Sequence, residues 1–211
     1  TLVGYATADE VRRAFKEEAG GQGKLLLGES SSAYKRFEEN VELADRAFRQ
    51  FREMQTERGM DSSQFASAKV TLRKQMKVLE DELNKYLASD YGVKTNDKVG
   101  FADWLITSMP FHWFVEFFGI VSSGGFDVII GNPPYVVVTP EKVPYRIRDA
   151  QFKTHSTKNL YSLVCERSDQ LAQKQGAIAL IVQLTALSSE KMPPLQDLLL
   201  NRGLLIAPSF P

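Results

Sequence analysis

A short run near the middle of the chain combines residue types that can hold a flat amino group. Residues 126–135 read FDVIIGNPPY, an apolar segment of strand character closed by one glycine, one asparagine, two prolines and a tyrosine. Ligands of open parallel sheets bind beyond the carboxyl ends of the strands. Asn132, Pro133, Pro134 and Tyr135 follow such an end and are therefore the candidate site.

The two prolines predict a stiff loop that presents hydrogen-bond acceptors. Pro133 and Pro134 fix their own φ angles and restrain the residue before each of them to extended conformations. We expect Gly131 to let the backbone turn where a side chain would clash. The acceptors are then the side-chain oxygen of Asn132 and backbone carbonyls, including that of Pro133, while Tyr135 offers a flat aromatic face.

Such a loop suits an amine whose lone pair is delocalised into an aromatic ring or an amide. Two acceptors, one for each N–H, can hold the nitrogen and draw it toward a tetrahedral geometry, so that its lone pair points at an electrophile. Stacking of an aromatic side chain on a base contributes about 1–3 kcal/mol. No general base is required for a sulfonium methyl, because its leaving group departs neutral, so positioning supplies most of the catalysis.

The segments around this loop predict a parallel α/β arrangement. Near-continuous apolar strands that alternate with helices indicate a parallel sheet covered on both faces. A doubly wound domain needs more than three strands, so we expect others before residue 1 or after residue 211. The expected strands are 126–130, 176–182 and 203–208, and the expected helices are 110–121, 157–175 and 193–202.

The N-terminal part of the chain predicts helices. Residues 7–18 read as a short helix capped by Thr7 with Glu10, and a glycine-containing linker is expected at 19–32. Two long helices follow, each with apolar residues spaced by three and four along one face. The expected packing residues are Tyr34, Phe37, Val41, Ala44, Phe48 and Phe51, then Phe65, Ala68, Leu72, Met76, Leu79, Leu83 and Tyr86.

The connection between the long helices predicts an antiparallel hairpin. In residues 58–63, Gly59 can end the first helix and Asp61 can cap the second. We therefore divide the chain into a helical region at residues 1–95 and a partial α/β domain at residues 96–211.

The run FDVIIGNPPYV resembles motif IV of the amino-group DNA methyltransferases, which use S-adenosylmethionine and carry NPPY or NPPF where the target is the exocyclic amine of adenine. Residues 110–136 and 159–182 are similar to the corresponding parts of large single-chain restriction–modification enzymes and related phage-defence methylases. Residues 44–60 resemble the helical insertion that such proteins carry before motif IV. The implied fold is part of a Rossmann-like S-adenosylmethionine-dependent methyltransferase sheet, preceded by an α-helical hairpin insertion.

The resemblance also implies roles for the loop residues. Asn132 and Pro133 would bind the amine, Pro134 would rigidify the turn, and Tyr135 would stack on the adenine. Double-stranded DNA is the implied substrate, and its adenine must leave the duplex to reach the loop. Two alternatives remain open: a methyltransferase acting on a protein glutamine amide or an RNA base, and a catalytically silent helical interaction module.

The implied cofactor is S-adenosylmethionine, but its binding residues stay unassigned. The family's site rests on a glycine-rich strand–loop of the type ACGSG, and the nearest run here, LLLGESS at 25–31, is a poor fit. We expect this chain to carry the target-amine half of the site, to need the remainder of a parent polypeptide, and to be weak or inactive alone.

A basic segment follows the loop. Lys142, Arg146, Arg148, Lys153 and Lys158 outnumber the nearby acidic residues, so this segment either contacts DNA phosphates, which position a duplex without reading its sequence, or forms a solvated surface loop. The formal net charge of the whole chain is zero, which argues against a free-standing nucleic-acid binder.

The remaining composition excludes several classes. The single Cys165 permits no internal disulfide and fits a reducing cytoplasm, where we expect it as a buried, inert thiol. No apolar run approaches the roughly 18 residues of a membrane span, and no export signal opens the chain. Two distant histidines and one cysteine make no zinc-type cluster, and His112 is expected as a packed, hydrogen-bonded side chain.

Overall fold

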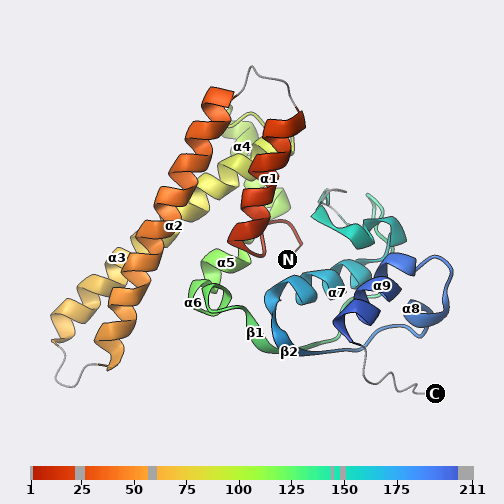
Figure 1. The fold of residues 1–211 in the computed structure, drawn as a ribbon. Helices are drawn as coiled ribbons and strands as arrows, with labels where there is room; N and C mark the ends of the chain where they lie inside the picture. The colour runs from red at the N-terminus through yellow and green to blue at the C-terminus, as the bar shows by residue number, and fades with distance from the viewer. Residues whose placement is uncertain (1, 22–26, 57–60, 144, 148–150, 204–211) are drawn as a thin grey trace.

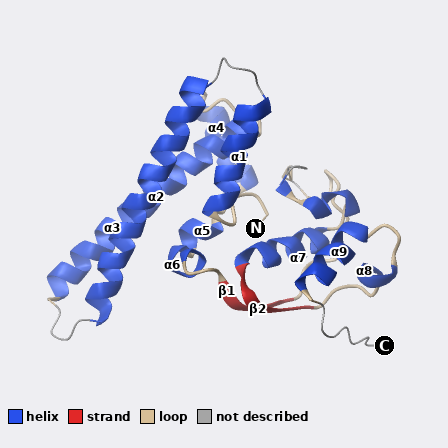
Figure 2. Cartoon of the chain, in the orientation of Figure 1, coloured by secondary structure: helices blue, strands red, loops and turns tan. Residues whose placement is uncertain are grey.

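A computed structural model of the chain describes residues 2–21, 27–56, 61–143, 145–147 and 151–203. Most of these residues are helical, and a small parallel sheet supplies the β-strands (Figure 2). The long helices lie beside a smaller part that contains the sheet, and the N-terminal segment lies between the two parts (Figure 1). Among the described helices, none is long and apolar enough to cross a membrane.

Two helices, α2 (Leu27–Thr56) and α3 (Ser62–Asp90), form the predicted antiparallel hairpin. Their packing faces are those that the spacing predicts, since Phe37 of α2 and Leu79 and Leu83 of α3 are buried in one cluster. Asp61 caps α3, because its carboxylate accepts the Ser63 N–H at 2.8 Å. The predicted role of Gly59 lies outside the described residues.

Helix α1 (Ala8–Gly21) begins with the predicted cap. The Thr7 hydroxyl accepts the Glu10 N–H at 3.1 Å, and the Glu10 carboxylate accepts the Ala6 N–H at 2.6 Å. The predicted linker at 19–32 is wrong at both ends, because α1 continues through Gly21 and α2 already begins at Leu27. Phe15 of α1 packs against Tyr34 and Phe37 of α2, and such tertiary contacts stabilise both helices beyond their local propensity.

Three shorter helices follow α3 and pack against the hairpin. They are α4 (Lys98–Ser108), α5 (Trp113–Glu116) and α6 (Phe118–Ser122). The single helix predicted at 110–121 is broken at Phe117, whose φ of −113° and ψ of 39° are not helical. The break seats Gly119 directly on α2, where an added Cβ would lie 2.1 Å from the Phe48 ring. Close packing against the hairpin therefore overrides the local helical pattern.

The sheet consists of β1 (Phe126–Gly131) and β2 (Ala172–Leu180), which are parallel and joined by a crossover containing η2 (Lys153–Thr157) and α7 (Leu160–Leu171). The parallel pairing confirms the prediction. The predicted change from helix to strand at residue 176 is wrong by four residues. The polar residues 173–175 resemble a helix end, but the Gln173 side chain donates to the Gly125 carbonyl at 3.1 Å and joins them to the strand.

Helices cover one face of the sheet in the described part of the chain. Helices α7 and α9 (Pro193–Arg202) pack together, with the short α8 (Thr185–Ser188) beside them (Figure 1). Cys165 lies buried in this cluster. On the sheet itself Val128 and Ile130 are 61% and 75% exposed. The predicted coverage of both faces is therefore not met by these residues, and the strand predicted at 203–208 falls almost entirely outside them.

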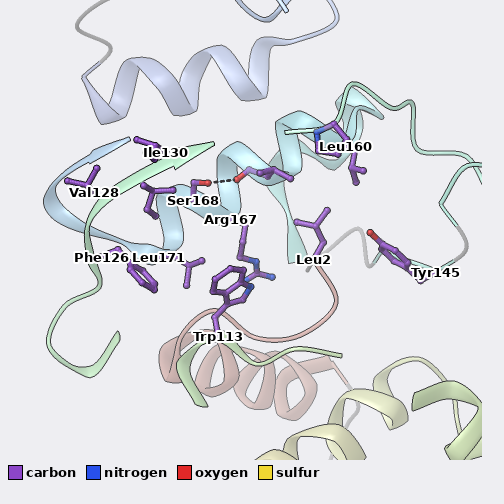
Figure 3. A pocket seen from close by; sticks show the side chains of 13 residues that line it. Leu2, Trp113, Phe126, Val128, Ile130, Tyr145, Leu160, Arg167, Ser168 and Leu171 are labelled. Atoms are coloured by element: carbon purple, nitrogen blue, oxygen red, sulfur yellow. Dashed lines mark hydrogen bonds between the residues drawn. The ribbon is translucent and has the colours of Figure 1, made fainter. Parts of the chain in front are cut away.

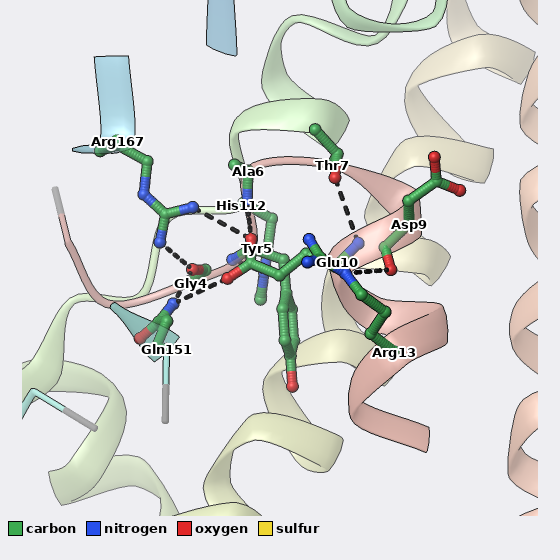
Figure 4. Close-up of polar contacts among 10 residues, drawn as sticks. All are labelled: Gly4, Tyr5, Ala6, Thr7, Asp9, Glu10, Arg13, His112, Gln151 and Arg167. Atoms are coloured by element: carbon green, nitrogen blue, oxygen red, sulfur yellow. Dashed lines mark hydrogen bonds and ion pairs between the residues drawn. The ribbon is translucent and has the colours of Figure 1, made fainter. Parts of the chain in front are cut away.

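A buried polar network joins the helical part to the sheet part (Figure 4). Arg167 of α7 pairs with Glu10 of α1 at 3.0 Å and donates to the Gly4 carbonyl at 3.0 Å. His112 lies beside it and is 2% exposed. Its Nδ1 accepts the Tyr5 N–H at 3.3 Å, so its Nε2 carries the proton and donates to Asn84 Oδ1 at 3.1 Å. This confirms the expectation of a packed, hydrogen-bonded histidine.

Substitution of Leu79 by alanine tests the hairpin core. Leu79 is fully buried, so Leu79→Ala should lower the free energy of unfolding by about 2–5 kcal/mol, through lost burial and the cavity left behind. Val70 of the same helix is 65% exposed, and Val70→Ala should change it by less than about 0.5 kcal/mol. Denaturant unfolding of both variants measures the difference. Equal effects would contradict the assigned packing face.

His112 predicts an acid dependence of stability. Burial, and secondarily the charge of Arg167, lowers the pKa of His112 from 6.5 to about 3. Between these values the unfolded chain binds a proton that the folded chain does not. Stability from this group is therefore complete above pH 6.5 and falls by about 1.4 kcal/mol per pH unit toward pH 3. Unfolding free energies of the wild type and His112→Gln should diverge in slope across this window; parallel slopes would contradict it.

Candidate functional site

The candidate loop begins where β1 leaves the sheet. The last paired residues are Gly131 and Leu180, and the Ile181 N–H donates to the Gly131 carbonyl at 3.0 Å. The expected reason for Gly131 is wrong: its φ is not positive, and an added Cβ would meet Leu180 at an ordinary 3.5 Å. The turn therefore depends on the residues that follow the glycine.

The acceptors of the loop are available. Asn132 is exposed, and no described residue forms a hydrogen bond with its side chain. Pro133 is buried, and no hydrogen bond between described residues uses its carbonyl. The Pro134 carbonyl is occupied, because it accepts the Val136 N–H at 3.0 Å in a tight turn. The Asn132 side-chain oxygen and the Pro133 carbonyl are thus without a hydrogen-bond partner among the described residues.

Tyr135 is held at one end and accessible along its ring. Its hydroxyl donates to the Ile181 carbonyl at 3.0 Å, which ties the loop to the end of β2. Its ring meets that of Tyr161 edge-on, with centroids 6.0 Å apart. The side chain remains 45% exposed, so it can still contact a ligand.

The chain after the loop is held by a short antiparallel pairing. Val137 bridges Asn159, the Val138 N–H donates to the Lys158 carbonyl at 2.8 Å, and the Leu160 N–H donates to the Val136 carbonyl at 2.8 Å. Residues 132–135 are therefore held on both sides, at the end of β2 and at the start of α7. Little backbone freedom remains to be lost when a ligand binds.

A cavity of about 490 Å³ runs beside β1 and reaches the loop at Pro134 (Figure 3). Most of its lining is apolar, and Arg167 is the charged residue among the described lining residues. The full lining is Leu2, Trp113, Phe126, Val128, Ile129, Ile130, Pro134, Tyr145, Leu160, Val164, Arg167, Ser168 and Leu171. A flat apolar group fits this space better than a charged one.

The described residues do not fit a complete S-adenosylmethionine site. That cofactor carries a sulfonium cation and ribose hydroxyls, whereas the cavity beside the loop is apolar and its charge is the cation of Arg167. The Arg167 guanidinium is already directed to Glu10 and Gly4.

The structure does not gather the described basic residues into one cluster around the loop. Lys142, Arg146, Lys153 and Lys158 are exposed, and Arg148 lies outside the described residues. Lys158 stands next to the pairing that follows the loop, with a left-handed φ of 52°. Contact of the four exposed residues with a nucleic acid stays a prediction. No metal-binding cluster occurs in the described ranges.

Two buried charges near the loop were not predicted. Glu166 and Arg167 lie within the helix predicted at 157–175, and they are 5% and 3% exposed. Their partners are distant in the sequence, as with Glu10, 157 residues before Arg167. The sequence signal that could have identified them is two adjacent residues of charged type that follow the apolar run of the helix. Burial also raises the pKa of Cys165 to about 12, which confirms an inert thiol.

The comparisons with known proteins agree with this arrangement. The sequence profile of the Eco57I restriction-modification methylase family matches residues 38–206, which is most of the chain. The chain therefore belongs to that family. The matched range contains both strands, the loop and most of the hairpin, whose first helix α2 begins earlier, at Leu27.

A curated relative extends the comparison to a much longer protein. It is named as a type II restriction enzyme and methyltransferase from Methanocaldococcus jannaschii, and it is 43% identical over 60 residues. Those residues are 24% of this chain and 5% of the relative, so the match spans a small part of that protein. No solved structure gives a significant match.

Proposed function

We propose that this chain carries the target-binding half of an adenine-specific DNA methyltransferase of a restriction–modification or defence system. The observation that carries the proposal is that Asn132 is exposed and its side chain has no hydrogen bond to a described residue, on a loop that is fixed on both sides at the end of a parallel strand. Family membership supports methyl transfer, and adenine as the target is our own inference from the loop chemistry. The division into a helical region at 1–95 and an α/β domain at 96–211 is part of this proposal.

The mechanism follows from what the loop can hold. The two N–H groups of the adenine amine donate to Asn132 Oδ1 and to the Pro133 carbonyl, which directs the nitrogen lone pair away from the ring plane. The Tyr135 ring stacks on the flipped base, and its hydroxyl stays bonded to the Ile181 carbonyl. Pro134 keeps the turn rigid. Asn132 Oδ1 and the Pro133 carbonyl stay neutral acceptors, and the proton that the nitrogen loses after methylation passes to water and not to a residue of the loop.

The methyl donor is proposed to be S-adenosylmethionine, which the methylase family implies. Its binding residues are proposed to lie mainly in other parts of a longer protein. The apolar cavity beside β1 supports this, because its described lining includes no carboxylate that could accept from ribose hydroxyls. Among the predicted basic residues, Lys142, Arg146, Lys153 and Lys158 are proposed to approach the phosphates of double-stranded DNA.

Removal of the Asn132 amide tests the loop chemistry. In the full-length protein, Asn132→Ala should lower the single-turnover rate of methyl transfer to DNA by about 10²–10³, because one preorganised acceptor is lost. The matched control is Gln175→Ala, an exposed amide in β2, which should leave the rate within about twofold. Unchanged methylation by Asn132→Ala would reject the assigned role. Transfer to RNA or protein in place of DNA would keep the chemistry and change the substrate.

The chain by itself should transfer no methyl groups. The 211 residues, with helical content verified by circular dichroism, are incubated with DNA and S-adenosylmethionine labelled in its methyl group. We expect incorporation at background, and activity in the full-length protein under the same conditions. Turnover by the isolated chain would show that it holds the whole cofactor site.

A further inference from the structure

The carboxylate of Glu166 lies buried in α7 and accepts three hydrogen bonds. Oε1 accepts the Lys153 N–H at 3.0 Å, while Oε2 accepts the Thr154 N–H and the Thr154 hydroxyl, each at 2.8 Å. Glu166 is 5% exposed, and none of the ion pairs between described residues includes it. Two backbone N–H groups and one hydroxyl are the described groups that bind the carboxylate, so the carboxylate and the segment it binds depend strongly on each other.

The segment held by Glu166 is η2. Phe152, at its N-terminal boundary, makes no side-chain cap, so the Lys153 and Thr154 N–H groups are satisfied by the carboxylate of another element. At the other end of η2, the Thr157 hydroxyl donates to the Thr154 carbonyl at 2.8 Å and contacts the Ser162 hydroxyl. The whole turn is thereby fixed onto α7.

The turn leads directly to the pairing that holds the loop. Asn159 follows η2, and its side chain donates to the Thr157 carbonyl at 2.8 Å. Asn159 bridges Val137, two residues after Tyr135. A continuous set of hydrogen bonds therefore connects the Glu166 carboxylate, through η2 and residues 158–160, to the downstream side of the loop.

We propose that Glu166 is a positioning residue for the amine-binding loop, and this inference rests on the proposed function. Glu166 touches neither the loop nor any group that would react. Glu166 fixes η2, and η2 fixes residues 158–160. These residues hold residues 136–138, so that the acceptors of Asn132 and Pro133 keep their positions. A carboxylate is needed because its two oxygens accept from two backbone N–H groups at once. An amide would place its NH2 donor against one of these N–H groups.

The test compares Glu166→Gln with Asp169→Asn in the full-length protein. Both remove one carboxylate from α7, but Asp169 is directed to Arg202 of α9 and makes no described contact with η2. For Glu166→Gln we expect the single-turnover methylation rate to fall about tenfold at saturating DNA, with the Kd for DNA within about twofold. Amides of residues 136–138 should exchange about tenfold faster with solvent deuterium, while those of α2 and α3 should not change. Asp169→Asn should show neither effect.

A milder variant keeps the test decisive if Glu166→Gln does not fold. Thr154→Val removes one of the three bonds to the carboxylate and should move the exchange of residues 136–138 and the rate in the same direction, by a smaller factor. Unchanged exchange and rate in a folded variant would overturn the role of Glu166. Failure of the proposed function is distinct, because then Asn132→Ala would also retain methylation while the exchange result could still hold.

Discussion

The buried guanidinium of Arg167 is the interaction on which the arrangement of the chain depends. A charge removed from water must be met by acceptors, and here they come from segments far apart in the sequence: Glu10 of α1, the Gly4 carbonyl, and the ring of Phe152, which lies 4.9 Å below the guanidinium carbon. If one partner moves away, the guanidinium is left as an unpaired buried charge. This cost keeps the N-terminal segment, α1 and α7 in contact. The helical part and the sheet part thus meet at a charge, in addition to their apolar contacts.

The candidate site is stabilised by hydrogen bonds between neutral groups. Almost every polar group around the loop has a partner, from the Tyr135 hydroxyl to the backbone of residues 136–138, and these bonds remove freedom from the backbone. The Asn132 side chain, within the described structure, has none. Rigid surroundings, in which the Asn132 side chain and the Pro133 carbonyl have no described partner, are what a site needs when it works by positioning, because no reorganisation is then required on binding.

The sequence predicted the parts in which local pattern and final contacts agree. The hairpin followed from spacings of three and four that also place Phe37, Leu79 and Leu83 in the core. The parallel strand pair and the helix at 193–202 followed from apolar runs and proline. The start of β2 could not be predicted, since the Gln173 side chain and the Arg202 guanidinium bind carbonyls there that no local pattern reveals. The predicted role of Gly131 was wrong, and the burial of Glu166 and Arg167 was not predicted, for a related reason. The surroundings of these residues are set by residues more than ten positions away.

The bare side of the sheet has a consequence for handling the protein. Val128, Ile130 and Ile181, each more than 60% exposed, form an apolar border on β1 and just after β2, and each of these strands has an edge that no other described strand pairs with. Salts such as sulfate strengthen the burial of such surfaces. Precipitants of that kind will therefore favour association of molecules through this border, and dilute, low-salt buffers will keep them apart.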